Sequence, residues 1–180
     1  MTLSKWDFDY AHSSVDFTIR HMLVSKVRGR FAKWTGNLQI DEDNYAASSF
    51  DVSIEVSSID TNEAQRDGHL RSGDFFEVEK FPHMTFTSKH VARRDERDEH
   101  LVVTGDLSLR GVTKEIVLDV ERGGIVPKDP WGKRRAGFVA TTKINRKDFG
   151  LTFNQTLDHG GLALGEEVSI TLEIEATLAG

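Results

Sequence analysis

Residues 168 to 178 read Val-Ser-Ile-Thr-Leu-Glu-Ile-Glu-Ala-Thr-Leu, so that apolar and polar side chains alternate without a break. Successive side chains of a β-strand point to opposite faces of its sheet, and this period of two therefore predicts a strand. One face of the strand is apolar, and the other is rich in threonine and glutamate. The pattern is typical of an antiparallel sheet that buries one face and leaves the other in water.

The same alternation recurs along most of the chain. Shorter stretches with this period lie at residues 6–10, 15–19, 27–40, 50–56, 84–87, 101–109, 116–121 and 138–144. Turn signals such as Arg110-Gly111 and Gly123-Gly124 separate some of them. Gly29 and Gly36 lie inside strand-like sequence and predict bulges or bends. The pattern predicts an all-β protein of about eight or nine strands.

Closure into a barrel is one way in which such a sheet can hide its edges. We therefore expect a single antiparallel β-barrel of about eight strands. No linker or repeat interrupts residues 1–180, so we expect one domain. A barrel of this size either fills its interior with side chains or encloses an apolar cavity, and alternation alone does not decide between the two. Small residues at inward positions, Gly105, Ala140 and Ala176, favour the cavity.

The composition limits the classes of partner and chemistry. A net charge of −6 disfavours a nucleic-acid partner, and we interpret the basic cluster Lys133-Arg134-Arg135 as part of a solvated loop rather than a phosphate site. The chain has no cysteine, which excludes disulfides, a thiol nucleophile and thiolate metal sites. No stretch approaches the roughly 18 apolar residues of a membrane-spanning helix. The N-terminal residues form no apolar leader, so we expect a cytoplasmic protein; a periplasmic one whose sequence starts at its mature terminus would look the same.

Residues 60–82 break the alternation. Asp60 or Thr61 is the expected N-cap of a short helix over 62–67, with Gly68 as its natural stop. A turn and the aromatic pair Phe75-Phe76 follow. We expect a short helical insertion around residues 61–76, which is either a lid over the mouth of the barrel or a plug that caps its core.

Residues with catalytic or metal-binding potential do not form a recognisable motif. None of the seven histidines has the spacing of a metal site, so no metal is expected. Ser13, His12 and Asp16 lie along one extended segment, which prevents the convergent geometry of a catalytic triad. Residues 146–150, Arg-Lys-Asp-Phe-Gly, are interpreted as a structural turn in which Asp148 could pair with Arg146.

Several short motifs, in this order and across nearly the whole chain, resemble those of the YceI-like family of polyisoprenoid-binding, lipocalin-like bacterial proteins. The clearest are residues 66–72 (Arg-Asp-Gly-His-Leu-Arg-Ser), 74–76 (Asp-Phe-Phe), 105–114 (Gly-Asp-Leu-Ser-Leu-Arg-Gly-Val-Thr-Lys) and 144–150 (Ile-Asn-Arg-Lys-Asp-Phe-Gly). Each motif alone is weak, and their combination is specific. The resemblance implies a lipocalin-like antiparallel barrel with a small helical segment and a long apolar pocket.

By this resemblance the expected ligand is an isoprenoid lipid, of the polyprenyl quinone or polyprenyl phosphate type, or a similar fatty amphiphile. No other cofactor is implied, and the protein is expected to be a non-catalytic carrier or sequestering protein. Strand parity and the resemblance together assign the tail to Phe17, Ile19, Phe31, Ile54, Phe75, Phe76, Phe86, Leu107 and Phe138. They assign the head group to Arg20, His21, Asp67, His69 and Arg71.

Two other functions stay open. An enzyme acting on such a lipid would use His21 or His69 as acid or base, and would need a carboxylate or tyrosine partner beside it. A barrel with a filled core would serve as a protein-interaction module. A homodimer is possible, because a second copy can cover an exposed sheet edge.

Overall fold

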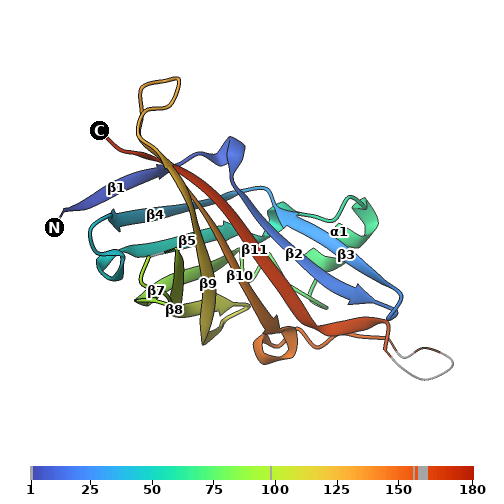
Figure 1. Ribbon diagram of the computed structural model, residues 1–180. Coiled ribbons are helices and arrows are strands. Elements are labelled where there is room, and N and C mark those ends of the chain that lie inside the picture. The colour runs from blue at the N-terminus through green and yellow to red at the C-terminus, as the bar shows by residue number, and fades with distance from the viewer. Residues whose placement is uncertain (1, 98, 156, 158–161) are drawn as a thin grey trace.

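The computed structural model describes residues 2–97, 99–155, 157 and 162–180. Within them the chain forms strands and short helices (Figure 1). The strands are β1 (Leu3–Phe8), β2 (Ser14–His21), β3 (Ser25–Phe31), β4 (Trp34–Asp41), β5 (Ser49–Glu55), β6 (Ile59–Asp60), β7 (His83–Arg93), β8 (His100–Leu109), β9 (Val112–Val126), β10 (Arg135–Asn145) and β11 (Leu164–Leu178). The helices are α1 (Ala64–Arg71) and the 3₁₀ turns η1 (Tyr10–His12), η2 (Tyr45–Ala47), η3 (Val56–Ser58) and η4 (Arg146–Phe149).

The strands close into an antiparallel barrel. Eight of them pair in the ring β1-β4-β5-β7-β8-β9-β10-β11, which closes between β11 and β1. β11 pairs with β1 through Ala176–Leu178 and with β2 over the preceding part of its length. From β2 the sheet continues into β3 and β6. The predicted eight-stranded, lipocalin-like barrel is confirmed, and the larger strand number arises because β1–β2, β3–β4 and β5–β6 are interrupted.

The interruption between β1 and β2 is the turn η1. Asp9 caps this turn by accepting a hydrogen bond from the Ala11 N–H at 3.1 Å. The Ser13 hydroxyl donates to the Glu175 carbonyl at 3.2 Å and accepts from the Glu175 N–H at 3.0 Å. These bonds attach the turn to β11, so the backbone groups of Glu175 keep partners where β11 passes from one strand to the next.

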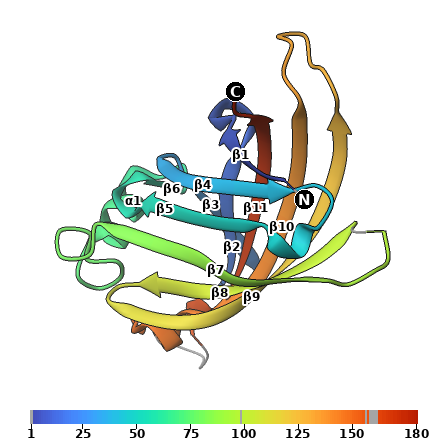
Figure 2. The ribbon, with the colours of Figure 1, turned by 90° about the vertical axis from the view of Figure 1, so that its left-hand side faces the viewer.

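The insertion covers the end of the barrel at which β3 has few neighbours. Within the described residues, β3 pairs with β2 and, through Arg30 and Phe31, with the two residues of β6, and with no other strand. Helix α1 and the loops after it lie beside β3, past the ends of β4 and β5 (Figures 1 and 2). No helix in the described part of the chain is long and apolar enough to cross a bilayer.

The bounds of α1 differ from those expected. Its N-cap is Glu63, whose carboxylate accepts from the Arg66 N–H, because Asp60 belongs to β6 and Thr61 is bonded to Asp67. Gly68 lies inside the helix instead of ending it. A Cβ atom at this position would meet no other atom within 4 Å. The helix continues to Arg71, and the turns 73–76 carry the aromatic pair.

The strand glycines allow close packing and do not form bulges. The register of β2 with β3 and of β4 with β5 runs unbroken past Gly29 and Gly36. A Cβ atom on Gly29 would lie 2.3 Å from the ring of Phe17, and one on Gly36 would lie 2.3 Å from the Asp51 carbonyl oxygen. The prediction of bulges at these glycines is wrong, because the space that a side chain would take is already filled.

The predicted basic loop instead contains a partly buried charge network at Arg135. The guanidinium Nη1 donates to Asp9 Oδ2 at 2.6 Å and to Glu175 Oε2 at 2.9 Å, and Nη2 donates to Asp129 Oδ2 at 2.9 Å. Arg134 pairs with Glu42, with 2.9 Å between Nε and Oε1. Arg135 thus joins the β9–β10 hairpin to the start of the chain and to β11, and its charge is matched by carboxylates.

The network shifts the pKa of its carboxyl groups. The hydrogen bond from Arg135 lowers the pKa of Asp9, while backbone N–H donation from Lys133, followed by Arg135, lowers the pKa of Asp129. A carboxyl group whose pKa is lower in the folded state stabilises the fold above its unfolded pKa of about 4. That contribution is lost as the pH falls through the lower, folded value.

We predict that Arg135→Met lowers the melting temperature by several degrees at pH 7, and that its difference from the wild type shrinks below about pH 4. Thermal unfolding followed by circular dichroism between pH 2 and 8 measures both effects. Arg134→Met removes an ion pair whose two side chains are about one third exposed and is the matched control, with a smaller effect. A difference between Arg135→Met and the wild type that is constant over this pH range would contradict the assignment.

Candidate functional site

A cavity of about 370 Å³ lies inside the barrel. This volume falls within the roughly 300–1,000 Å³ of typical small-molecule sites. Its wall is formed mainly by inward-facing side chains of β2, β5, β7, β8 and β11 and by residues of the insertion. The interior of the barrel is therefore not completely filled, which decides between the two alternatives that the alternation left open.

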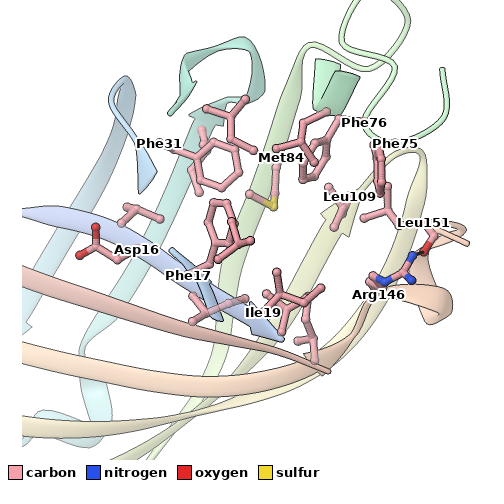
Figure 3. Close-up of a pocket in the computed structure, with 18 of the residues that line it drawn as sticks. Asp16, Phe17, Ile19, Phe31, Phe75, Phe76, Met84, Leu109, Arg146 and Leu151 are labelled. Carbon is pink, nitrogen blue, oxygen red and sulfur yellow. Dashed lines mark hydrogen bonds between the residues drawn. The ribbon is translucent and has the colours of Figure 1, made fainter. Parts of the chain in front are cut away.

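Aromatic side chains form much of one wall. The ring of Phe17 lies 5.6 Å from that of Phe31, which lies 6.0 Å from that of Phe76. Phe75 and Phe153 are 5.2 Å apart, also measured between ring centroids. Figure 3 shows Phe17 and Phe31 on one side of the space, with Phe76 and Phe75 of the insertion toward the other. Since Gly29 has no Cβ, the tip of the Phe17 ring can lie against the backbone of β3 at this position.

Buried hydrogen bonds hold the insertion in place. Asp67, which is 7% exposed, accepts from the Thr61 N–H at 2.9 Å and from the Thr61 hydroxyl at 2.5 Å. Arg71 donates to the carbonyls of Ser57 and Ile59 at 2.9 and 3.1 Å. These contacts fix α1 against β6, and the turn after it places Phe75 and Phe76 on the cavity. The insertion is therefore a cover whose aromatic pair faces an open space.

Polar lining residues gather where β2 ends and β11 begins. His21 pairs with Leu164, and Asn154 donates to the Leu164 carbonyl at 2.7 Å and accepts from its N–H at 3.0 Å. The His69 ring lies 4.9 Å from that of Phe153. The polar lining residues of this end are His21, His69, Asn154 and Gln155. Asp16 and Arg66 also line the cavity, but Arg66 is bonded to Thr61 beside β6, away from this end. The lining is mostly apolar, and we call the end with His21, His69, Asn154 and Gln155 the mouth.

Arg146 is a lining residue with a different role. It is 3% exposed, and it donates to the carbonyls of Gly165 at 2.7 Å, Leu151 at 2.6 Å and Phe153 at 2.9 Å. Burial lowers its pKa. The expected pairing with Asp148 is wrong, because backbone carbonyls already accept from this guanidinium. Arg146 holds residues 151–153 against the start of β11 and so shapes this part of the wall (Figure 3).

Ten of the residues predicted to bind the ligand line this cavity. They are Phe17, Ile19, His21, Phe31, Ile54, His69, Phe75, Phe76, Phe86 and Leu107. Phe138 lines a second, smaller cavity. Arg20, Asp67 and Arg71 do not line the main cavity: Arg20 is exposed on the outer face of β2, and the other two are the structural contacts of the insertion described above.

Sequence reasoning missed several lining residues. Met84 and Leu109 share the inward parity of their strands and could have been found from it. Leu151, Phe153 and Asn154 lie in a stretch without periodicity, so no sequence pattern marks them. Arg146 resembles an ordinary turn residue, and only the fold shows that it is buried.

The second cavity has a volume of about 80 Å³ and an apolar lining. Phe50, Leu118 and Leu172 line both cavities and therefore lie between them. Val91 and Phe138 line only the second. A long apolar chain in the main cavity would meet this boundary at the end of the barrel away from the mouth.

Two groups of acidic residues and histidine within the described residues could approach a cation. In the first, Arg135 already bonds the carboxylates of Asp9 and Glu175. The second, Asp95 with Glu99 and His100, lies at an exposed hairpin. None of these residues lines the cavity.

Comparison with known proteins places the chain in a family. A family model described as the YceI-like domain matches residues 6–176. A UPF0312 protein of Staphylococcus aureus is 36% identical over 177 residues, which are 98% of this chain and 99% of that protein. The crystal structure of a Campylobacter jejuni YCEI protein superposes with a TM-score of 0.77 at 34% identity, over 89% of this chain and 90% of the other.

Two more distant structures share the fold. BcnA of Burkholderia cenocepacia has a TM-score of 0.82 at 23% identity, over 95% of this chain and all of that one. A polyisoprenoid binding domain from Saccharophagus degradans has a TM-score of 0.67 at 17% identity, over 99% of this chain and 100% of that domain. With the family model and the closer relatives matching nearly its whole length, this chain belongs to the YceI-like family.

Proposed function

We propose that the protein is a non-catalytic carrier of an isoprenoid lipid, of the polyprenyl quinone or polyprenyl phosphate type, or of a similar long-chain amphiphile. The observation that carries the proposal is the cavity: about 370 Å³ within a mostly apolar wall, with the polar side chains of His21, His69, Asn154 and Gln155 at its mouth. An amphiphile would place its tail in the interior and its head group at His21, His69 and Asn154. The fold shared with a domain described as polyisoprenoid binding supports this ligand class.

Burial of the tail supplies the binding energy. Each buried CH₂-sized group contributes about 0.8 kcal/mol. Burial of a few isoprene units therefore supplies more free energy than binding needs, before the costs of association and ordering are subtracted. This term depends on area and has no direction. The protein should therefore discriminate poorly between tails of similar length, and fatty amides or detergents should compete with isoprenoids.

Catalysis has weaker support than carriage. His69 has a carboxylate partner, with 2.8 Å between its Nε2 and Asp74 Oδ2, but both side chains are about half exposed at the surface. A water-excluded site is what makes a catalytic acid or base effective. If the wild-type protein turned over a lipid and His21→Ala or His69→Ala abolished that turnover, the carrier assignment would be wrong.

The direct test is mass spectrometry of an organic extract of the purified, untagged protein, followed by titration of the delipidated protein with a prenyl quinone. We expect about one amphiphile per chain in the extract or, for an empty protein, saturable binding of about one per chain. A protein that contains no amphiphile and binds neither the quinone nor a fatty amide of similar length would refute the proposal.

Gly29→Ala should lower the affinity for the amphiphile about tenfold, because its Cβ would push the Phe17 ring from β3 into the cavity. Gly124→Ala is the matched control, since a Cβ on this glycine of β9 meets nothing within 4 Å. Titration of both variants with the same prenyl quinone measures the effect. Equal affinities of Gly29→Ala and the wild type would show that the tail does not occupy the space beside Phe17.

Phe50→Ala should shift the preferred tail to greater length, because it removes a side chain between the two cavities. Affinities for a series of saturated fatty amides would show the optimum moving by several carbons. Val91→Ala enlarges the second cavity without opening the boundary and should leave the optimum unchanged. An unchanged optimum in Phe50→Ala would place the end of the tail elsewhere.

A further inference from the structure

The hairpin between β2 and β3 ends in three consecutive apolar side chains that face water. Met22, Leu23 and Val24 are 44%, 70% and 85% exposed. Single exposed apolar residues are ordinary, but a contiguous run at a projecting tip usually marks a contact surface. The tip lies at the mouth end of the barrel, where β2 and β3 reach their common end (Figure 1).

The backbone of this tip is unusual for its side chains. Met22 and Leu23 have φ angles of 52° and 62°, in the left-handed region where glycine, asparagine and aspartate are favoured. The turn is held by hydrogen bonds from the Met22 N–H to the Ala163 carbonyl at 2.7 Å and from the Val24 N–H to the His21 carbonyl at 3.2 Å. The backbone of the tip therefore has a conformation that glycine, asparagine or aspartate would adopt more easily. Its residues nevertheless carry large apolar side chains, which are exposed to water. Stability of the turn does not explain this choice of residues.

A positive patch adjoins the tip. Arg20 pairs across the strands with Lys26, and Arg28 follows on the same face of β3; all three are exposed. None of them forms an ion pair in the part of the chain that the structure describes. The protein as a whole has a net charge of −6, so these three cations form a locally positive patch on a protein of negative net charge.

Acidic groups near the patch already have partners. Arg20 packs near Gly165 of β11, and the next residue, Glu166, pairs with Lys147 at 2.7 Å. Glu167 lies 3.7 Å from Lys143, and Asp60 lies 3.5 Å from Arg30. The charge of Arg20, Lys26 and Arg28 is therefore available to an external anion.

The tip and the mouth of the cavity are continuous. His21 and Val27, which flank the hairpin on its two strands, both line the cavity, as does Leu164 opposite His21. A surface that contacts the tip would therefore lie next to the polar end of the cavity. A long-chain lipid is almost insoluble in water, so its source and destination are membranes.

We propose that the β2–β3 hairpin docks on an anionic bilayer. Met22, Leu23 and Val24 enter the boundary between head groups and acyl chains, while Arg20, Lys26 and Arg28 contact the anionic head groups. The docking places the mouth on the bilayer for loading and release of the amphiphile. Only this last role in transfer rests on the proposed carrier function; the docking itself can be measured without a ligand.

The test is cosedimentation of the protein with vesicles of phosphatidylcholine alone or with one quarter phosphatidylglycerol. We expect binding to the anionic vesicles at 50 mM salt, with much weaker binding at 500 mM salt and to neutral vesicles. The triple variant Arg20→Gln/Lys26→Gln/Arg28→Gln should bind about 100-fold more weakly.

Leu23→Asn/Val24→Ser should also lose most of the binding, although asparagine suits the left-handed position of Leu23 and the variant is expected to fold well. Val126→Ser/Trp131→Ser removes exposed apolar side chains from the β9–β10 hairpin and is the matched control, with unchanged binding. Absence of binding to anionic vesicles by the wild type, or equal binding by Leu23→Asn/Val24→Ser, would overturn the proposal.

The native mass of the wild type and of Leu23→Asn/Val24→Ser decides whether a second copy covers the tip instead. A dimer that this variant converts to a monomer would make the hairpin a self-interface and would refute docking. Titration of the delipidated protein with the prenyl quinone and the fatty amide in the absence of vesicles separates the two proposals. A wild type that binds neither ligand refutes the carrier function, while vesicle binding alone decides the docking.

Discussion

The architecture depends on the hydrogen bonding of β11. On one edge this strand pairs with β10 from Arg135–Thr177 to Asn145–Glu167, and on the other it pairs first with β2 and then with β1. Buried backbone groups without partners are costly, so two strands must share this edge without leaving a gap. The turn η1 meets that requirement through the bonds between Ser13 and Glu175. Because β11 pairs with β2 along one part of its length and with β1 along the other, the two ends of the barrel are built from different strands.

At one end the ring through β1 and β4 closes, and the interior is narrow. Small side chains such as Ala140 and Ala176 lie there, the second cavity is only about 80 Å³, and Arg135 ties the adjacent hairpin to Asp9 and Glu175. At the other end, β2 continues into β3, whose next neighbour in the described part of the chain is the two-residue β6. The insertion covers the remaining opening, and the larger cavity lies beneath it. The hollow and the lid therefore have one cause, which is the incomplete pairing of β3.

The fold could be predicted from the sequence because its signal is local and repeated. Period-two alternation marked the strands, and the ordered motifs indicated the family. Inward parity also placed Phe17, Ile19 and Leu107 on the lining correctly. The predictions that were wrong concern residues whose role depends on partners distant in sequence. Gly29 is explained by the Phe17 ring across the strand, and Arg146 by the carbonyl of Gly165, neither of which its own neighbourhood reveals.

The head-group residues illustrate the same limit. Asp67 and Arg71 have the charge expected of ligand contacts, but each instead satisfies backbone groups that would otherwise be unpaired beneath the insertion. Asn154, in a stretch without pattern, reaches the mouth because it pairs with both backbone groups of Leu164. The hydrogen bonds of these polar side chains to the backbone therefore explain their positions without a role in ligand binding.

The alternation of β2 also explains how two surfaces meet at the mouth. Phe17, Ile19 and His21 point into the cavity, and the intervening Arg20 must therefore point outward, beside Lys26 of β3. The two faces of one strand consequently carry the apolar interior and the cationic exterior, and both end at the hairpin 22–24. A lipid that leaves a bilayer at this hairpin would pass along β2 without crossing an extended aqueous surface. The same period that predicts the strand from the sequence therefore brings the two surfaces together, and no additional domain is needed to join them.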